Sequence, residues 1–538
     1  MMLQVIVAVI CLAASIPAVL RWLRVAQREH YIPDLTSRFA YRWWASSPVN
    51  ILLALVGCAG IVISARFSVA AFGSAVVAIV GPVGLSLRGV SSPLIWTRRL
   101  KTLAAVSVSI EAIIIIVGIL LGHGSTAGAV IDIGSCAIVD LGSYILAPLE
   151  DRLSNVYIRD AKDRLAKVSP TVIAITGSYG KTSTKLYTAH LLSGYFRTQA
   201  SPASFNNRAG LSRAINEQLL DSTEIFVAEM GTYGQGEIRD MCSWMRPEIS
   251  AITAIGPVHL ERMKSEERIL QAKSEITETA STVVLQVDDL RLAGLANYLG
   301  SNGKRVIRCS SKKSYSADGA GSVDSGSLQL SEQRAGEPTN GVADVRAIRD
   351  AASGLVSVYI GHELIVSELR LEAHPSNVAC AVGLAVAAGC PNEIVAKQLL
   401  TLPSSPHRLS KVKEDGHVTI LDDTYNSNPA GCMAALRLLE EEKCDGSKVL
   451  VTPGMVELGT RSRQENESFA RAAAVLADVV LIVGRTNRRY LSNGISQAAK
   501  QPKVLFFTRR DQAVNWVRDN LTVEDVVLYE NDLPDHYP

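Results

Sequence analysis

A glycine-rich segment at residues 171–185, TVIAITGSYGKTSTK, contains the residues best suited to chemistry in this chain. An apolar run precedes the glycines and a helix-forming run follows them, so the turn should join a buried strand to a helix N-terminus. Backbone N–H groups in such a turn can surround a polyphosphate, and the helix dipole favours the same negative charge. Lys181 can neutralise phosphate oxygens and the Thr182 hydroxyl can bind Mg²⁺. The segment therefore predicts an ATP site.

The spacing of this turn differs from the common phosphate-binding pattern, which has four residues between its first glycine and the Gly-Lys pair. Ile175 stands at the position of that glycine, so the chain has a shorter form, G-x-x-G-K-T-S. A chance glycine turn with a surface lysine is the alternative, and it explains the strand–turn–helix context poorly. The residues predicted to bind ATP here are Gly177, Ser178, Tyr179, Gly180, Lys181, Thr182 and Ser183.

Further polar candidates follow in the same half of the soluble region. Glu229 ends the apolar run EIFVAE, and an acid at the end of a parallel strand faces the ligand crevice, where it could bind Mg²⁺. His259 also follows a strand, although imidazole is a less common magnesium ligand and a structural histidine is the alternative. Lys273 lies in a helical run, where a lysine is ordinarily a surface or ion-pair residue. Asn206 and Asn207 form either a loop with exposed amides or a simple turn.

A second polar group precedes and follows a strand near residue 420. Arg408 is suited to phosphate or carboxylate oxygens. Asp422 and Asp423 end the strand, and Pro429 is placed to begin the next helix. Polar loops at strand ends are common binding locations. The loop side chains predicted to contact substrate are Tyr425, Asn426 and Asn428.

The composition of the chain bounds its class. Its 538 residues are enough for three or four domains, and a net charge of +2 gives no electrostatic case for nucleic acid. A mean hydropathy of +0.18 with 20% charged residues indicates a membrane part joined to a soluble part. The nine cysteines include no C-x-x-C pair, so reduced thiols are expected rather than a zinc site or a disulfide framework.

The first 150 residues predict a helical transmembrane region. A span needs about 20 mostly apolar residues. The first candidate lacks a basic leader and a convincing cleavage site, so it predicts an anchor rather than a signal peptide. Glu111, Asp132 and Asp140 fall within the spans, either as a pathway or as hydrogen-bonded acids. The five candidate spans are residues 3–20, 49–65, 69–87, 103–121 and 127–146.

Basic residues orient these spans. Positive loops stay in the cytoplasm, so the N-terminus should lie outside and five spans would leave the remaining chain in the cytosol, where ATP is available. The second and third spans could instead form one re-entrant unit. The basic residues that follow the first span are Arg21, Arg24, Arg28, Arg38 and Arg42, and those before the fourth are Arg88, Arg98, Arg99 and Lys101.

The soluble part alternates short apolar runs with helical stretches, which predicts two α/β units with mainly parallel sheets. Residues 151–402 form the first unit and residues 403–538 the second. Residues 310–341, rich in serine and glycine, are expected to be a loop or a small insertion. The predicted strands are residues 172–176, 225–228, 250–254, 283–287, 305–309, 418–421, 448–452, 479–483, 503–507 and 526–529.

Several ordered segments of the soluble part resemble the Mur ligase family, closest to its MurF type. They are ITGSYGKTSTK, FNNRAG, AEMGTYGQGEI, ITAIGPVHLERMKSEERILQAKSEI, PHRL, DDTYNSNPAGCMAAL, TPGMVELGTRSRQEN and IVGRTNRRYLSNGI. The resemblance implies a P-loop ATPase domain with a parallel sheet, followed by a Rossmann-like C-terminal α/β domain. It also implies ATP-dependent ligation of a carboxylate to an amine through an acyl phosphate, in bacterial peptidoglycan or a related cell-wall peptide.

The same resemblance assigns roles to residues. Mg²⁺ would be held by Thr182, Glu229 and His259, with Lys273 joining them if it is carbamylated. Asn377 would lie near the adenine of ATP. Arg408 and Asp423 would close onto the nucleotide as the C-terminal domain moves, and residues 425–428 would face the cleft between domains. The residues to which the resemblance gives a catalytic role are Lys181, His259, Lys273, Arg408 and Asp423.

Two departures from the family pattern affect the substrate and the nucleotide. The family's N-terminal domain, which binds a uridine nucleotide sugar, is replaced by the membrane region. Gln286 stands where the MurF type has asparagine, and the segment from His374 to Asn377 is one residue shorter, so adenine contacts are expected to differ.

The partners expected are a peptide or muropeptide carboxylate donor, an amine acceptor such as an amino acid or dipeptide, and membrane lipid. The donor could be UDP-linked or lipid-linked, or the product could be a γ-linked amino-acid polymer. A transport-coupled ATPase is a rival of a different class, and a catalytically dead scaffold is a third.

Overall fold

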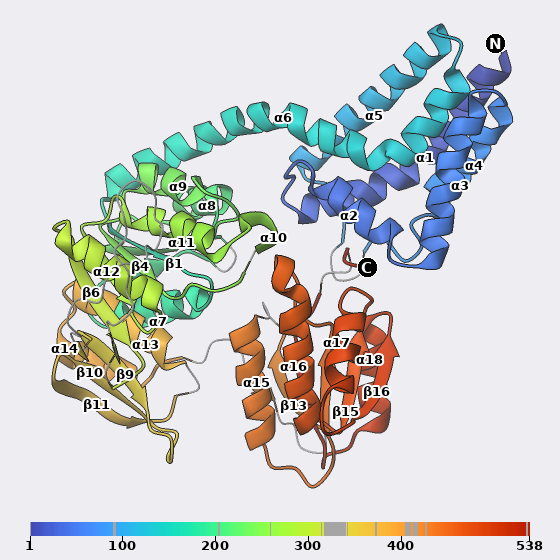
Figure 1. Ribbon diagram of the computed structural model, residues 1–538. Coiled ribbons are helices and arrows are strands. Elements are labelled where there is room, and N and C mark those ends of the chain that lie inside the picture. The colour runs from blue at the N-terminus through green and yellow to red at the C-terminus, as the bar shows by residue number, and fades with distance from the viewer. Residues whose placement is uncertain are drawn as a thin grey trace.

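A computed structural model of the chain has three parts, namely an N-terminal helical bundle, a central α/β domain and a C-terminal α/β domain (Figure 1). The residues that the structure describes are 2–89, 93–202, 205–258, 260–313, 315–316, 340–341, 343–371, 374–403, 410–412, 418–424, 428–533 and 536–538.

The bundle has three helices that are long and apolar enough to cross a membrane, namely α1 (Met2–Arg28), α5 (Arg98–Leu120) and α6 (Gly124–Val168). The pair α2 (Leu35–Trp44) and α3 (Pro48–Ser64) passes the same test jointly but bends by 113°. The predicted third span is a shorter apolar helix, Ser68–Val80, made of η1 (Ser68–Ala70) and α4 (Ala71–Val80). The five predicted spans thus correspond to helices, and their number across a membrane stays a prediction.

Two charged side chains of the bundle satisfy helix ends. Arg21 donates from Nη1 to the carbonyl oxygens of Ala78 (2.9 Å) and Gly81 (3.0 Å), where the last carbonyls of α4 have no partner within the helix. Asp140 accepts hydrogen bonds from the backbone N–H groups of Thr36 (3.3 Å) and Ser37 (2.8 Å) in the first turn of α2. These contacts fix α2 and α4 at one end of the bundle.

The acids predicted within the spans have different surroundings. Glu111 is buried and accepts a hydrogen bond of 2.8 Å from the Ser15 hydroxyl, so it fits the hydrogen-bonded alternative. Asp132 is also buried in the bundle. Asp140 has the helix-capping contacts described above.

The 45-residue helix α6 joins the bundle to the central domain, and Figure 1 shows it running from one to the other. Its last third belongs to the core of the central domain, where Ile158, Ala161 and Leu165 are buried. Arg164 donates to the carbonyl oxygen of Leu219 (2.6 Å) on that domain. The boundary predicted at residue 150 therefore falls inside a continuous helix, which ties the two parts together without a loop.

The central domain is built on a nine-stranded sheet with the order β11-β10-β9-β6-β5-β4-β1-β3-β2. The strands from β2 to β9 in this order pair in parallel, and β10 and β11 add an antiparallel edge. The strands are β1 (Thr171–Thr176), β2 (Thr198–Ala200), β3 (Ile225–Glu229), β4 (Ile249–Ile252), β5 (Thr282–Gln286), β6 (Arg305–Ser310), β9 (Val345–Arg349), β10 (Val356–Ile360) and β11 (Glu363–Leu369).

Helices cover both faces of this sheet, so the central strands β1, β3, β4 and β5 are mostly apolar and buried along nearly their whole length rather than alternating. One face packs on α6, α8 (Arg208–Gln218), α9 (Glu237–Met245), α11 (Glu266–Ser274) and α12 (Leu290–Ser301). The other face packs on α7 (Lys181–Ser193), α13 (Pro375–Ala387) and α14 (Asn392–Leu399). The alanine-rich α13 is thus a core helix of the central domain.

Within the segment predicted as a loop at residues 310–341, the described residues include a short antiparallel pair, β7 (Tyr315–Ser316) and β8 (Asn340–Gly341). Most of that segment lies outside the described residues.

The C-terminal domain has a six-stranded sheet with the order β12-β13-β17-β14-β15-β16, parallel except for β12. This agrees with the predicted Rossmann-like pattern, and all five predicted strands are present. Its strands are β12 (Ser410–Val412), β13 (Thr419–Asp423), β14 (Lys448–Thr452), β15 (Val479–Val483), β16 (Lys503–Phe507) and β17 (Val526–Glu530). Its helices are α15 (Pro429–Glu441), α16 (Ser462–Leu476), α17 (Arg488–Ser496) and α18 (Arg510–Asn520), with a short η3 (Gly459–Arg461).

Candidate active site

The predicted phosphate loop joins β1 to α7, as the sequence pattern requires. Gly177 and Gly180 both have positive φ, of +156° and +78°. A Cβ at Gly177 would lie 2.0 Å from the Thr253 hydroxyl oxygen, and a Cβ at Gly180 would lie 2.2 Å from the Asn377 side-chain oxygen. Ser178 fixes the turn by donating from its backbone N–H to the Ala254 carbonyl (2.7 Å). The loop therefore depends on glycine at two positions, which leaves its backbone open to a ligand.

Two lysines converge on this loop from different helices. Lys181, at the start of α7, donates from Nζ to the carbonyl oxygen of Gly177 at 2.8 Å. Lys273, near the end of α11, donates to the same oxygen at 3.1 Å and is 2% exposed. Burial, and then the charge of Lys181, hold the pKa of Lys273 well below its usual value. The interpretation of Lys273 as a surface lysine is therefore wrong, and its burial favours the neutral form of the amine that carbamate formation needs.

Glu229 ends β3 beside the loop and is 3% exposed. Its Oε2 lies 3.3 Å from Nζ of Lys185, and its Oε1 accepts a hydrogen bond of 3.2 Å from the Asn206 amide. Burial alone would raise the pKa of Glu229, but Lys185 and Lys181 outweigh it and lower that pKa overall. Glu229 is thus an ionised, buried carboxylate next to the residues expected to meet phosphate.

These residues fit a magnesium ion that bridges to a nucleotide. Mg²⁺ keeps several waters and binds through one or two carboxylates together with substrate phosphates, so Glu229 and the Thr182 hydroxyl at the start of α7 suffice as protein ligands. No group of three or more His, Cys, Asp or Glu side chains that could hold a metal occurs among the described residues. His259, the other predicted ligand, lies outside them.

Replacing Glu229 by glutamine is expected to raise the Mg²⁺ concentration for half-maximal ATP turnover by on the order of 10–100-fold. The glutamine amide keeps the side-chain volume but removes the negative charge of Glu229, which attracts Lys185 and would attract the metal. Turnover measured across a Mg²⁺ titration checks this, with Glu224→Gln at the exposed start of the same strand segment as the matched control. An unchanged Mg²⁺ dependence would rule out Glu229 as a ligand.

Three predicted substrate residues have described positions, and two of them cap helices. Asn207 accepts a hydrogen bond from Gly210 N (2.9 Å) at the N-terminus of α8, and Asn428 accepts one from Gly431 N (2.9 Å) at that of α15. Asn206 instead binds Glu229, as described above. The Asn207 side chain thus caps a helix and that of Asn206 lies beside Glu229, while a contact of either with substrate stays a prediction. Three further predicted residues, Arg408, Tyr425 and Asn426, lie outside the described part of the chain.

Asn377 and Asp423 have clear positions. Asn377 lies in the first turn of α13 with its amide against Gly180, so the structure brings it to the phosphate loop. Gln286, the residue that replaces an asparagine, ends β5 and donates to Asp288 at 2.5 Å. Asp423 is 8% exposed at the end of β13, on the C-terminal domain. A contact of either with adenine or nucleotide stays a prediction.

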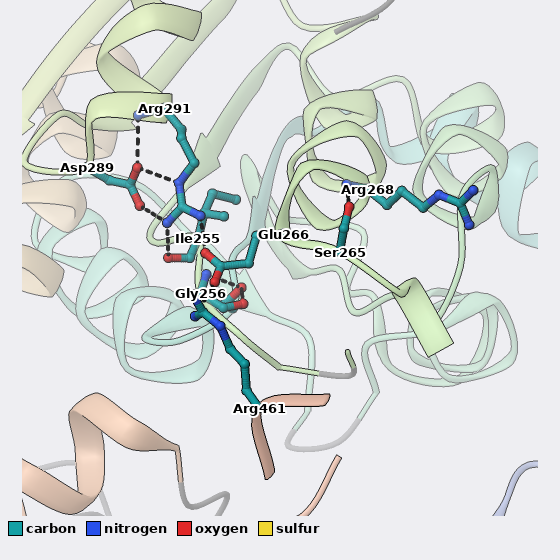
Figure 2. A network of polar contacts seen from close by, with 9 residues as sticks. Ile255, Gly256, Ser265, Glu266, Arg268, Asp289, Arg291 and Arg461 are labelled. Carbon is teal, nitrogen blue, oxygen red and sulfur yellow. Dashed lines mark hydrogen bonds and ion pairs between the residues drawn. The ribbon is translucent and has the colours of Figure 1, made fainter. Parts of the chain in front are cut away.

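A charged network that sequence reasoning missed connects the C-terminal domain to the loop. Figure 2 shows Glu266 between two arginines, Arg291 of α12 and Arg461 of η3, with the latter bond at 2.5 Å. Arg291 also donates to the carbonyl of Ile255 (3.1 Å), next to Gly256, whose own carbonyl accepts from the Ser178 hydroxyl (3.1 Å). The signal that could have identified Arg461 is its place in TPGMVELGTRSRQEN, one of the segments that resemble the Mur ligase family.

Comparison with known proteins matches two family models to the soluble part. Residues 175–336 match the Mur ligase middle domain, and residues 407–529 match the Mur ligase glutamate ligase domain. A UDP-N-acetylmuramoyl-tripeptide–D-alanyl-D-alanine ligase of Bacillus subtilis is 26% identical over 377 residues, which cover 69% of this chain and 75% of that protein. The same ligase of Mycobacterium leprae is 31% identical, covering 58% of this chain and 61% of that protein.

Solved structures share the fold. MurF ligase from Thermotoga maritima in complex with ADP superposes with a TM-score of 0.55 at 22% identity, covering 70% of this chain and 80% of that one. MurF from Acinetobacter baumannii gives 0.54 at 24% identity, covering 69% and 76%. A pseudomurein peptide ligase type C from Methanothermus fervidus gives 0.51 at 18% identity, covering 68% and 77%.

The phosphate loop, its two lysines and the buried carboxylate define an ATP-dependent enzyme on an α/β scaffold. With both domain models matched in order, the chain belongs to the Mur ligase family, whose members use ATP and Mg²⁺ to form amide bonds. The predicted family and its MurF type are confirmed. The chain spans about three fifths of the mycobacterial relatives, and the N-terminal bundle lies outside both family models.

Proposed function

We propose that this protein is a membrane-anchored, MurF-like ligase that joins the carboxylate of a peptide donor to an amine in cell-wall peptide synthesis. The observation that carries the proposal is the convergence of Lys181 and Lys273 on Gly177, beside the ionised carboxylate of Glu229. This arrangement combines the cationic Lys181 for phosphate with a carboxylate for magnesium. Burial of Lys273 favours its neutral amine, which a purely structural lysine would not need.

The residues divide the chemistry among them. A donor carboxylate oxygen attacks the γ-phosphorus of ATP, which gives an acyl phosphate and ADP. The amine then attacks the acyl carbon, loses a proton and expels phosphate. Lys181 and the loop N–H groups stabilise the negative charge that gathers on phosphoryl oxygens in the first step. When bound, Mg²⁺ supplies further positive charge there, and Glu229 and Thr182 would hold it.

The role proposed for Lys273 depends on its neutral amine, which burial of the side chain favours. Its neutral amine can add to carbon dioxide and release one proton, which converts a potential cation into an anionic carbamate. That anion would lie beside Lys181, whose charge it would balance, and near enough to the loop to bind the metal. The carbamate is part of the proposal.

One experiment tests the ligase activity and identifies the group to which the carboxylate donor is linked. The experiment supplies purified protein with ATP, D-alanyl-D-alanine and either a UDP-linked or a lipid-linked muropeptide tripeptide, and determines product mass. A product heavier than the donor by the dipeptide less one water supports the proposal in either arm. ATP hydrolysis that needs no acceptor and is coupled to solute flux would favour the transport ATPase instead.

Membrane anchoring by the bundle is part of this proposal. If α3 and α4 both cross the membrane, α1, α5 and α6 bring the count to five spans, and if α3 and α4 re-enter on one side the count is three. We infer one of these odd counts, which places the N-terminus and the ligase domains on opposite sides, whereas the bent pair α2–α3 crossing as a single fourth span would place them on the same side. With basic residues concentrated at the ligase end, that side is the cytoplasm.

This topology predicts the labelling of two introduced cysteines. His123, exposed in the turn between α5 and α6, should as His123→Cys react with a membrane-impermeant maleimide in intact cells. Lys162→Cys, on the exposed side of α6 at the central domain, should react only after the membrane is opened. Each is compared with labelling of the parent. The reverse pattern would contradict the orientation.

A further inference from the structure

A cavity of about 400 Å³ lies where the three parts of the chain meet. The bundle contributes residues of α2 and the preceding segment, the central domain contributes α10 (Leu260–Met263) and Lys264, and the C-terminal domain contributes the turn at Glu457 and the ring of Tyr537. Four cationic and three anionic side chains line it, so its charge is net positive. The basic residues are Arg38, Arg42, Arg262 and Lys264.

Contacts between the three parts build the walls of this cavity. The indole N–H of Trp43 donates to the carbonyl of His536 (2.8 Å), and the rings of Phe39 and Tyr537 pack edge to face with centroids 5.0 Å apart. The backbone N–H of Glu261 donates to the carbonyl of Glu457 (3.4 Å). The cavity is therefore formed by defined contacts from all three parts of the chain.

Two of the four cations are occupied by ion pairs. Arg42 pairs with Glu261 and Arg262 pairs with Glu29, each at 2.5 Å. The second amino group of Arg262, Nη1, is buried and has no hydrogen-bond partner within the described part of the chain. The Arg262 guanidinium also lies over the Tyr233 ring, with Cζ 4.4 Å from the ring centroid, so this arginine serves as a wall of the cavity.

The other two cations have spare donors. Arg38 is exposed and forms no ion pair with any described residue, and Lys264 donates from Nζ to a neutral acceptor, the carbonyl of Glu261 (2.9 Å). Lys264 and Glu457 also hold left-handed backbone conformations, with φ of 71° and 63°. Such strained residues persist where surrounding contacts hold them and gather at ligand sites. Arg38 and Lys264 thus present donors to one volume, as a phosphate group requires.

We propose that this cavity binds the diphosphate ester of the carboxylate donor, a refinement that rests on the proposed ligase function. The bundle occupies the place of the family's nucleotide-sugar domain, so the diphosphate needs another site. The cavity lies at the end of the bundle, and the chain runs directly from Lys264 into α11, which carries Glu266 and Lys273. An extended peptide covers about 3.3–3.6 Å per residue, so a tripeptide donor spans about 10 Å toward the phosphate loop.

The test measures binding without turnover. Saturating ADP and Mg²⁺ first fill the phosphate loop of the full-length protein in detergent. Affinities are then measured for farnesyl diphosphate, which stands for a lipid-linked donor, and for uridine diphosphate, which stands for a nucleotide-linked one. The Arg38→Ala/Lys264→Ala protein is compared with Arg159→Ala/Lys162→Ala, which removes two exposed cations of α6. Thermal unfolding and ADP affinity confirm that each variant is folded.

The Arg38→Ala/Lys264→Ala protein is expected to bind one diphosphate at least about tenfold more weakly, while the α6 variant binds it like the parent. Loss for farnesyl diphosphate assigns a membrane-delivered donor, and loss for uridine diphosphate assigns a soluble one. Equal affinities in parent and cavity variant for both probes, or equal losses in both double variants, would overturn the diphosphate site. Neither result depends on amide formation, so the ligase proposal is judged separately by product mass.

Discussion

ATP turnover should fall by on the order of 10²–10³-fold or more when Lys181 is replaced by alanine, since it removes the main protein charge offered to the phosphoryl group. The side chain lies half-buried in the first turn of α7 and contacts the Gly177 carbonyl, so its loss leaves no core cavity. The variant should remain folded and in the membrane. Phosphate release under saturating ATP and Mg²⁺ measures the effect.

The matched control is Lys167→Ala, at the exposed end of α6. It should keep the parent rate and the parent melting temperature. Near-normal turnover by the Lys181 variant would refute the phosphate loop as the site of ATP chemistry. A large drop in melting temperature for that variant alone would instead show a structural role.

The second large effect concerns Lys273, whose carbamate we expect to be required for full activity. Lys273→Ala should slow turnover by on the order of 10–100-fold, the range found when support of a metal site is lost. Removing dissolved carbon dioxide should lower the rate of the parent, and added bicarbonate should restore it. Lys273→Met, which keeps the buried volume, should respond to neither treatment.

The pH dependence has a definite sign. Because burial and Lys181 lower the pKa of Lys273, its neutral amine exists at pH values below those of an exposed lysine, for which the ordinary value is 10.5. Bicarbonate activation should therefore persist at neutral pH. In buffer free of carbon dioxide, the free energy of unfolding of the parent should rise relative to that of Lys273→Met as the pH increases from the lowered pKa of Lys273 toward 10.5. In this pH window the lysine binds a proton in the unfolded state but not in the folded state, so a higher pH favours folding. Equal activity of parent and Lys273→Met at every bicarbonate level would refute the carbamate.

Much of the scaffold could be predicted because its signals are local. The two strands that carry the site are apolar runs, β1 ending at the glycine turn and β3 ending at Glu229. The apolar run and the residue type that ends it were enough to locate each strand. The strands at the two ends of the central sheet, β2 at one end and β9, β10 and β11 at the other, were missed. Their side chains alternate in burial or are partly exposed, and their pairing depends on neighbours distant in sequence.

The site shows the same division. Lys181 and Thr182 follow from the loop motif, whereas the burial of Lys273 does not follow from its helical run. Only the packing of α11 against the loop buries that lysine and lowers its pKa, and only the family resemblance pointed to it. The Arg291–Glu266–Arg461 network joins residues nearly 200 positions apart, and no local pattern encodes such a contact.

The helix α13 illustrates how context decides a role. Its alanines favour a helix, but they do not indicate which elements that helix packs against. In the structure their small side chains let α13 pack closely on the sheet and bring Asn377 to Gly180. The same residue types would suit an exposed connecting helix, so the difference lies in the tertiary contacts.

Transfer of oxygen from donor to phosphate tests the central claim most directly. A donor with ¹⁸O at both oxygens of the reacting carboxylate is supplied with ATP, Mg²⁺ and the amine, and the released phosphate is analysed by mass spectrometry. Attack of the carboxylate on the γ-phosphorus predicts one ¹⁸O atom in each phosphate released, together with a new amide. Phosphate that contains no donor oxygen would contradict the account, because the ATP would then have been hydrolysed by water.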